Sequence, residues 1–318
     1  MIIAYICVIS VWARAKRRSA PVSRAARLGA KIMAGMWILY GGMNVNLLTV
    51  NMEKCVKCGV CIKACPAGIV QWGELGFPEV SEKHAGRCIG CGQCVLNCPA
   101  CANELSFLKD SELARAEGLK LPSAEEALNL IMSRRSVRMF KDELITRETF
   151  EKLFNAVRQA PTAVNSQNVR WIVTLDPAKT KEVTNLILCW FREEIFKNPT
   201  SRAALLGAAM IAKAKEGEDR LLRGAPHVAV AVVPAEYGWP EDGAIALTYL
   251  ELAAHAMGIG CCWGGYLTTA IRNFKGLREY LGIGEDEHVC GAQMMGYAAV
   301  KPARQFAPRR EVRVDWIG

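Results

Sequence analysis

The sequence predicts an α+β protein in which a helix-flanked sheet follows a small cysteine-rich domain. Three observations lead to this expectation. The chain has 318 residues, the length of about two domains. Nine of its fourteen cysteines lie within residues 44–101. After residue 123, candidate helices and strands alternate, as they do when helices cover a sheet.

The composition is that of an ordinary globular protein. The chain is 51% hydrophobic and 22% charged, which excludes a disordered or collagen-like protein. Its net charge of +9 is unevenly distributed, because residues 1–43 contain seven basic residues and no acidic one. The rest of the chain has 33 basic residues against 31 acidic. This near-neutral balance argues against nucleic acid as a partner.

Residues 1–43 form a basic leader that we expect to be disordered, or to precede a true start at Met43. Its apolar runs, 2–12 and 32–40, are too short to span a bilayer, so no transmembrane segment is expected. Two alternatives remain open for the leader. The Arg17–Arg18 pair ahead of an apolar stretch allows twin-arginine export, and an amphipathic surface anchor is the other.

Three helices are predicted from their ends and from hydrophobic spacing. Ser123, with acidic residues in the following turn, marks the start of the first. The second covers 146–160, where apolar residues recur every three or four positions until Pro161. The third covers 244–257 and ends at Gly258, the residue type favoured after a helix C-terminus.

Two short runs rich in β-branched residues, 171–175 and 228–233, predict buried strands. Residues 293–299 and 312–317 are two further candidate strands. Together with the helices, they indicate a sheet with helices packed on it.

Two cysteine runs with the same spacing lie 33 residues apart. They are Cys55-x2-Cys58-x2-Cys61-x3-Cys65-Pro66 and Cys88-x2-Cys91-x2-Cys94-x3-Cys98-Pro99. Three thiolates two residues apart can wrap the backbone around one face of an iron–sulfur cubane. The spacing is that of the bacterial two-cluster run, in which the fourth cysteine of each run binds the other cluster.

The cysteine repeat therefore predicts a ferredoxin-like domain over residues 44–102 with two [4Fe–4S] clusters. One cluster would be held by Cys55, Cys58, Cys61 and Cys98, and the other by Cys65, Cys88, Cys91 and Cys94. Paired zinc sites and disulfides are the alternatives. Residues 103–122 are polar and are expected to form a linker to a second domain, 123–318.

A second redox centre is suggested by an arginine cluster after the first predicted helix. Arg134, Arg135, Ser136 and Arg138 would suit a phosphate group, because planar guanidinium groups match phosphate oxygens. A solvated basic helix end is the alternative reading. Two further segments offer suitable groups: 160–167 contains Asn165 and Gln167, and 258–265 presents glycine backbone that a flat ring could approach.

These segments, in this order, resemble the nitroreductase family of FMN-dependent oxidoreductases. The family pattern Arg-Arg-Ser-x-Arg-x-Phe is matched at 134–140. The pattern Ala-Pro-Ser-x-x-Asn-x-Gln is matched at 160–167, with Thr162 for Ser. A Gly-x-Gly and a Trp-containing glycine loop follow at 258–265, and a Gly-Tyr at 296–297. One departure is Asn168, where many members have Pro.

The resemblance, which covers about 123–318, implies a mixed sheet with flanking helices and a homodimer with FMN at the subunit interface. It also implies which residues bind FMN: Arg134, Arg135, Ser136 and Arg138 at the phosphate and ribityl chain, Asn165 and Gln167 at the ribityl chain or ring, Gly264 and Gly265 through their backbone, and Arg309 at the phosphate. No catalytic acid or base is identified.

The function implied is a flavin-dependent oxidoreductase that passes electrons between [4Fe–4S] clusters and FMN and reduces a small organic acceptor, such as a nitroaromatic or a quinone. NAD(P)H would be a transient donor, because no G-x-G-x-x-G fingerprint follows a strand. An external ferredoxin or other redox protein is the other donor. The cluster cysteines indicate a reducing cytoplasm.

Three alternatives to this function remain open. The chain is an electron-transfer or assembly subunit of a partner complex, it is a flavin enzyme of the same fold with other chemistry, or its clusters are purely structural. The other chemistries considered are dehalogenation, enone reduction and flavin reduction.

Overall fold

A computed structural model describes residues 46–108, 113, 120–304 and 309–318. The predicted leader, 1–43, and half of the predicted linker, 109–112 and 114–119, lie outside the described residues. The chain divides into two compact units, with the main division between residues 119 and 120.

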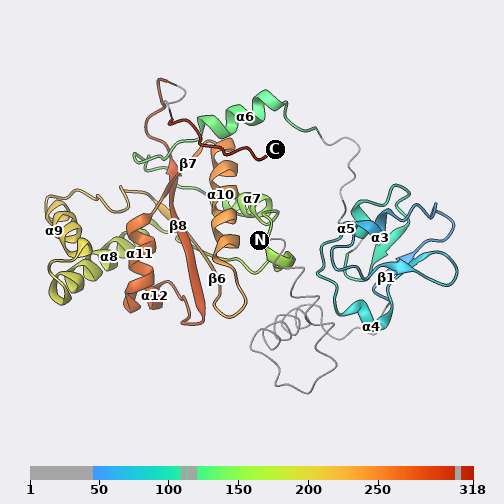
Figure 1. Ribbon diagram of the computed structural model, residues 1–318. Helices are drawn as coiled ribbons and strands as arrows, with labels where there is room; N and C mark the ends of the chain where they lie inside the picture. The colour runs from blue at the N-terminus through green and yellow to red at the C-terminus, as the bar shows by residue number, and fades with distance from the viewer. Residues whose placement is uncertain (1–45, 109–112, 114–119, 305–308) are drawn as a thin grey trace, which may run out of the picture. The chain divides into compact units, whose positions relative to one another are not determined.

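The first unit consists of short helices and two small antiparallel sheets (Figure 1). Strand β1 pairs with β4, and β2 pairs with β3. The elements are β1 (Leu48–Val50), α3 (Val60–Ala64), β2 (Gln71–Trp72), β3 (Pro78–Glu79), α4 (Glu82–Ala85), α5 (Gln93–Leu96) and β4 (Asn103–Leu105).

The cysteine repeat is also visible in the backbone of this unit. Gly59 precedes α3 at φ +71°, and Gly92, 33 residues later, precedes α5 at φ +69°. Only glycine adopts this left-handed conformation without steric cost. Both runs therefore turn in the same way just before their third cysteine, Cys61 or Cys94.

Strand β4 extends the first unit beyond residue 102, where the sequence analysis places its end. Asn103 and Leu105 are buried and Glu104 is exposed, the alternation of a half-buried strand. Leu105 pairs with Leu48 of β1. Residues 103–105 are thus part of the sheet and not of the linker.

The second unit is a four-stranded sheet with helices on both faces (Figure 1). Helices α7 and α10 lie on one side of the sheet, and α8, α11 and α12 lie on the other. In chain order, its elements are α6 (Ala124–Ser133), α7 (Arg147–Val157), β5 (Arg170–Val173), α8 (Pro177–Lys197), α9 (Arg202–Lys215), β6 (His227–Pro234), α10 (Pro240–Ala256), β7 (Ile259–Trp263), α11 (Gly265–Asn273), α12 (Lys275–Tyr280) and β8 (Glu287–Tyr297). The short helix η3 (Ala163–Asn165) follows α7 in the chain, and residues 164–166 are grouped with the first unit.

The strand order is β5-β6-β8-β7, and every neighbouring pair is antiparallel. Within the described part of this unit, the parallel pairing is an isolated bridge between Ser136 and Cys261. The α+β class with a helix-flanked sheet is confirmed. The mixed character of the sheet is limited to that single bridge.

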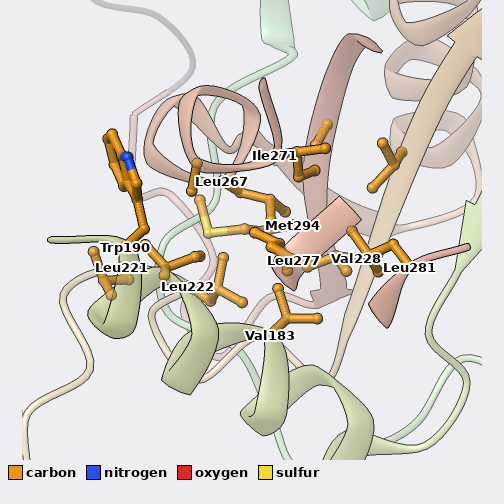
Figure 2. Close-up of a cluster of buried hydrophobic side chains, with 14 of the residues drawn as sticks. Val183, Trp190, Leu221, Leu222, Val228, Leu267, Ile271, Leu277, Leu281 and Met294 are labelled. Carbon is orange, nitrogen blue, oxygen red and sulfur yellow. The ribbon is translucent and has the colours of Figure 1, made fainter. Parts of the chain in front are cut away.

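Strand β6 separates two hydrophobic cores because its side chains alternate between the two faces of the sheet. Val228, Val230 and Val232 face a core that contains residues of α8, α11 and α12. Figure 2 shows Val183, Ile271 and Met294 converging there. Ala229 and Ala231 face the other core, with α7 and α10. All five β6 residues named here are fully buried.

The helix starts predicted at Ser123 and Thr146 are confirmed, whereas the helix predicted from residue 244 begins earlier, at Pro240. Ser123 Oγ accepts the N–H of Glu126, whose carboxylate in turn accepts the N–H of Ser123, a reciprocal capping box. Thr146 caps α7 by accepting the N–H of Thr149. After α10, Gly258 has φ +74°, as expected for a glycine beyond a helix C-terminus.

Two sequence-based expectations differ from the structure. The strand predicted over 312–317 is wrong, since residues 309–318 contain no strand and Ile317 is 99% exposed. A β-branched run forms a strand only beside a partner strand, and no described segment pairs with it. The segment 258–265, expected to be a glycine loop, instead contains β7. The patterns above do not predict α8 and α9.

Among the described residues, none of the helices combines the length and the apolar character that crossing a bilayer requires.

Candidate functional site

The eight cysteines of the repeat surround two cavities in the first unit. One cavity of about 280 Å³, part of it open to solvent, is lined by Cys55, Cys58, Cys61 and Cys98, here called the first quartet. The other, of about 390 Å³, is lined by Cys65, Cys88, Cys91 and Cys94, the second quartet. Each quartet combines three cysteines of one run with the fourth cysteine of the other.

The thiols within each quartet influence one another. Burial raises the pKa of Cys94 to about 12, and the neighbouring Cys88, Cys65 and Cys91 contribute to the rise. Burial also raises the pKa of Cys61, with a smaller contribution from Cys98. Four such thiols can lose their protons together only beside a strongly cationic group. Bound metal ions provide that positive charge.

The shape of the quartets suits a group larger than one ion. Among the described residues, no three Cys, His, Asp or Glu side chains converge closely enough to hold a single metal ion. Backbone N–H groups already point at the sulfurs: Ala102 donates to Cys98 Sγ at 3.3 Å, and Gly90 donates to Cys88 Sγ at 3.4 Å. Donors of this kind are typical around iron–sulfur clusters. The donor set and the cavities therefore fit clusters better than paired zinc ions.

In the second unit, Arg134 stands at the end of α6 and is held by a buried carboxylate. Its Nη1 donates to Glu251 Oε1 at 2.6 Å, and the two side chains are 26% and 7% exposed. The other oxygen, Glu251 Oε2, accepts the indole N–H of Trp263 at 3.3 Å. One turn further along α10, His255 shares a hydrogen bond of 2.8 Å with Ser133. This network joins the end of α6, α10 and the end of β7.

The segment after Arg134 runs beside β7. The N–H of Val137 donates to the carbonyl of Cys261 at 2.9 Å, next to the Ser136 bridge. Arg135 and Ser136 are half-buried, and Arg138 is exposed. Gly260 makes this approach possible, because a Cβ there would lie 2.7 Å from Val137 Cβ.

The loop after α7 contains Asn165 and Gln167 and has unusual backbone geometry. Val164, Asn165 and Gln167 have φ values of +48°, +56° and +49°, which are costly for non-glycine residues and cluster at functional sites. The loop is anchored on α10 by the N–H of Ala163, which donates to Asp242 Oδ1 at 2.9 Å.

The departure from the family pattern lies in the same loop. Asn168 Oδ1 is buried and has no hydrogen-bond partner among the described residues. Gln167 N–H donates to Thr162 Oγ1 at 3.1 Å, so the threonine that replaces the family serine serves as an acceptor here.

The remaining predicted contacts lie at the end of β7 and in the C-terminal segment. Gly264 N–H donates to the carbonyl of Ala292 at 2.8 Å, and the space around Gly265 is open. The structure thus brings Arg134, Ser136 and Gly264 to β7 and its end. Arg309 is exposed in the final segment, and no described contact connects it to the others.

Sequence reasoning missed Glu251 and Asp242, the two carboxylates that hold these segments on α10. Both are buried, with exposures of 6% and 3%. Their signal in the sequence is an acidic residue inside an Ala/Leu-rich helix, which indicates a buried partner. His227 is structural: its Nε2 accepts the N–H of Ile145, and its Nδ1 donates to Thr174 O. Burial lowers its pKa.

Comparison with known proteins agrees with both parts of this description. The model of the "Nitroreductase family" matches residues 131–297, and that of a "4Fe-4S dicluster domain" matches residues 54–103. The first match includes every predicted FMN contact except Arg309, and the second includes all eight cysteines of the two quartets.

The chain is similar to curated relatives and to solved structures. A protein of Archaeoglobus fulgidus named "Putative NADH dehydrogenase/NAD(P)H nitroreductase" is 31% identical over 197 residues, which are 60% of this chain and 99% of that protein. A protein of the same name from Methanothermobacter thermautotrophicus is 25% identical over 198 residues, covering 61% of this chain and 90% of that protein. A nitroreductase structure with bound FMN from Desulfitobacterium hafniense is 22% identical, with a TM-score of 0.49, covering 61% of this chain and 98% of that one.

The family match covers more than half of the chain, and the Archaeoglobus relative is matched over almost its whole length. The chain therefore belongs to the nitroreductase family of flavin-dependent oxidoreductases, and a 4Fe-4S dicluster domain precedes its family domain.

Proposed function

We propose that this protein is an FMN oxidoreductase in which two [4Fe–4S] clusters exchange single electrons with the flavin, and that it reduces a small organic acceptor such as a nitroaromatic or a quinone. The observation that carries the proposal is the division of eight cysteines into two crossed quartets, within a chain whose other unit belongs to the nitroreductase family. When bound, the clusters supply one-electron chemistry and FMN supplies both one-electron and hydride chemistry.

The two quartets would hold the clusters through their thiolates. The backbone N–H groups that point at Cys98 and Cys88 would stabilise the added negative charge on the sulfurs. The proposal assigns these roles to a domain that begins near residue 44 and, because of β4, ends near residue 105.

At the FMN site, the chain's own residues would bind and orient. Arg134, Arg135, Ser136 and Arg138 would hold the phosphate and ribityl chain, with Arg309 as a further phosphate contact. Glu251 fixes the guanidinium of Arg134, so that this side chain loses little conformational freedom on binding a phosphate.

The ring and ribityl contacts would come from two loops. Asn165 and Gln167 would form polar contacts with the ribityl chain or the ring. Gly264 and Gly265 would present backbone to the ring, and the open space at Gly265 allows a close approach. The protein would act as a homodimer in the cytoplasm, with NAD(P)H or a ferredoxin as the electron donor.

The first test measures cofactors in protein purified without oxygen. We expect FMN together with about eight irons per chain, from two clusters of four. Replacing Arg134 and Arg138 together with Ala should lower FMN retention and leave the iron content unchanged. The matched control replaces Arg147 and Arg192, exposed arginines on α7 and α8, and should retain FMN. Full FMN retention in the first double variant would refute the phosphate assignment.

The second test concerns electron transfer between the two centres. The Cys58→Ala variant should slow the reduction of FMN by reduced ferredoxin in anaerobic stopped-flow measurements, because it removes one thiolate of the first quartet. Replacing the nearby Cys101, which lies outside both quartets, should leave the rate unchanged. Equal rates in Cys58→Ala and the wild type would mean that the clusters are structural.

A further inference from the structure

The two cysteine cavities are related by the sequence repeat, yet they differ at one buried position. With the offset of 33 residues, the fifth residue after the last cysteine of each run is Val70 in the first run and Asn103 in the second. Both are buried, with exposures of 3% and 4%. Because the fourth cysteines cross over, Val70 lines the cavity of the second quartet and Asn103 lines the cavity of the first.

The carboxamide of Asn103 has a defined orientation. Its Nδ2 donates to the carbonyl oxygen of Cys94 at 2.7 Å, and since a carbonyl oxygen only accepts, the NH₂ end must be the one that faces Cys94. This NH₂ group carries a second hydrogen. Since Asn103 is buried and lines the cavity of the first quartet together with Cys61, that donor is available to a group bound there.

The backbone donors at hydrogen-bond distance are similar in the two cavities. Among the described residues, Ala102 donates to Cys98 Sγ at 3.3 Å in the first quartet, and Gly90 donates to Cys88 Sγ at 3.4 Å in the second. Val70, by contrast, has no side-chain donor to offer to the second quartet. At this repeat position, the first cavity therefore contains a side-chain hydrogen-bond donor, Asn103, and the second cavity does not.

We infer that Asn103 makes the cluster of the first quartet the higher-potential cluster of the pair, an inference that rests on the proposed binding of one [4Fe–4S] cluster by each quartet. Reduction adds one electron, and hence one negative charge, to a cluster. An N–H group directed at a cluster sulfur stabilises the more negative form and raises the reduction potential. The first electron to enter the domain would then reside mainly on the first quartet.

Surface charge acts in the same direction but more weakly. The first run has Lys57 and Lys63 where the second has Gly90 and Leu96. Both lysines are exposed, so salt screens their effect on the cluster. The contribution of the buried Asn103 should persist at high salt, which separates the two effects.

The test is an anaerobic potentiometric titration of the full holoprotein, with dithionite as the reductant and electron paramagnetic resonance as the readout. Asn103→Val makes the two cavities alike. One neutral hydrogen bond changes an equilibrium by up to roughly tenfold, and a tenfold change equals 59 mV for a one-electron couple. We expect the higher of the two midpoints to fall by up to about this amount at 1 M salt, while the lower stays in place.

Two further variants complete the design. Asn103→Thr has the shape of Val but retains a hydroxyl donor, so its higher midpoint should lie between those of Asn103→Val and the wild type. Val70→Asn places a carboxamide in the second cavity and should raise the lower midpoint. This variant also tests the inference if Asn103→Val does not assemble its clusters.

The results distinguish the inference from the proposed function beneath it. Unmoved midpoints in Asn103→Val and Val70→Asn, in protein with about eight irons per chain, would overturn the role of Asn103 alone. A fall of the lower midpoint in Asn103→Val would overturn the assignment of the higher potential to the first quartet. Wild-type protein without iron would instead refute the proposed function.

Discussion

The pair formed by Arg134 and Glu251 provides the sharpest test of how the second unit holds its candidate FMN site. Replacing Arg134 with Ala leaves a carboxylate that is 7% exposed with the indole N–H of Trp263 as its remaining hydrogen-bond donor among the described residues. Breaking a buried ion pair in this way costs about 3–5 kcal/mol. Because Arg134 is 26% exposed, water offsets part of this cost, and we expect about 3 kcal/mol.

The reciprocal variant, Glu251→Gln, is expected to be milder. The amide keeps the shape of the side chain and still accepts one hydrogen bond, so the loss of the charge should cost about 1.5 kcal/mol. When Glu251→Gln is already present, removing Arg134 then costs only about 1 kcal/mol, the value of a neutral hydrogen bond. The double variant should therefore be about 2 kcal/mol more stable than the sum of the single losses implies, within the range for residues in contact.

The assay is urea unfolding of FMN-free protein at neutral pH, followed by far-UV circular dichroism, which reports mainly on the long helices of the second unit. Arg147 and Glu151, one turn apart on α7, serve as a control pair: they are 75% and 60% exposed, and their coupling should stay below about 1 kcal/mol. If the losses for Arg134 and Glu251 simply add to within about 0.5 kcal/mol, the two side chains do not stabilise each other and the buried-pair reasoning is wrong.

Three further predictions follow from single sites. Burial lowers the pKa of His227 below its ordinary value of 6.5, so the unfolded chain takes up a proton first, and stability should fall by up to about 1.4 kcal/mol per pH unit below about pH 6.5. Urea unfolding from about pH 7.5 to about pH 5.5 should show a smaller slope in His227→Gln, where the part due to His255, whose pKa burial also lowers, remains. Gly260→Ala places a Cβ against Val137 and should cost about 1–3 kcal/mol, seen as a lower Tm, whereas Gly265→Ala, in open space, should leave Tm unchanged or raise it. Cys98→Ala should reduce the iron content from about eight to about four per chain, and a full complement of iron would remove Cys98 from the first quartet.

The parts of this protein that the sequence predicts well are those encoded by local spacing. The cysteine repeat carries its own geometry, because two or three residues between thiols determine how the backbone can turn, and the structure groups the eight cysteines as the spacing predicts. The capping box at Ser123 is likewise a matter of four consecutive residues.

Features that depend on contacts between distant segments were not predictable in the same way. Arg134 and Glu251 are 117 residues apart in sequence, and no local pattern connects them. The segment 312–317 has the composition of a strand, but composition supplies no pairing partner. Strand β7 was not predicted for a related reason. Taken alone, Gly260 favours a loop, whereas in the fold it allows Val137 to pack against the strand.

Helix α10 also acts as a spacer between two parts of the candidate site. Asp242 anchors the loop after α7, and Glu251 anchors the end of α6. Glu251 follows Asp242 by nine positions along the helix, a rise of about 13.5 Å and a rotation of about two and a half turns. Inserting or deleting one residue between them would turn one carboxylate by about 100° relative to the other, so that both anchors could not form together. The fold therefore constrains the number of residues between Asp242 and Glu251 as tightly as it constrains the two carboxylates themselves. Exposed positions along the helix are not constrained in this way.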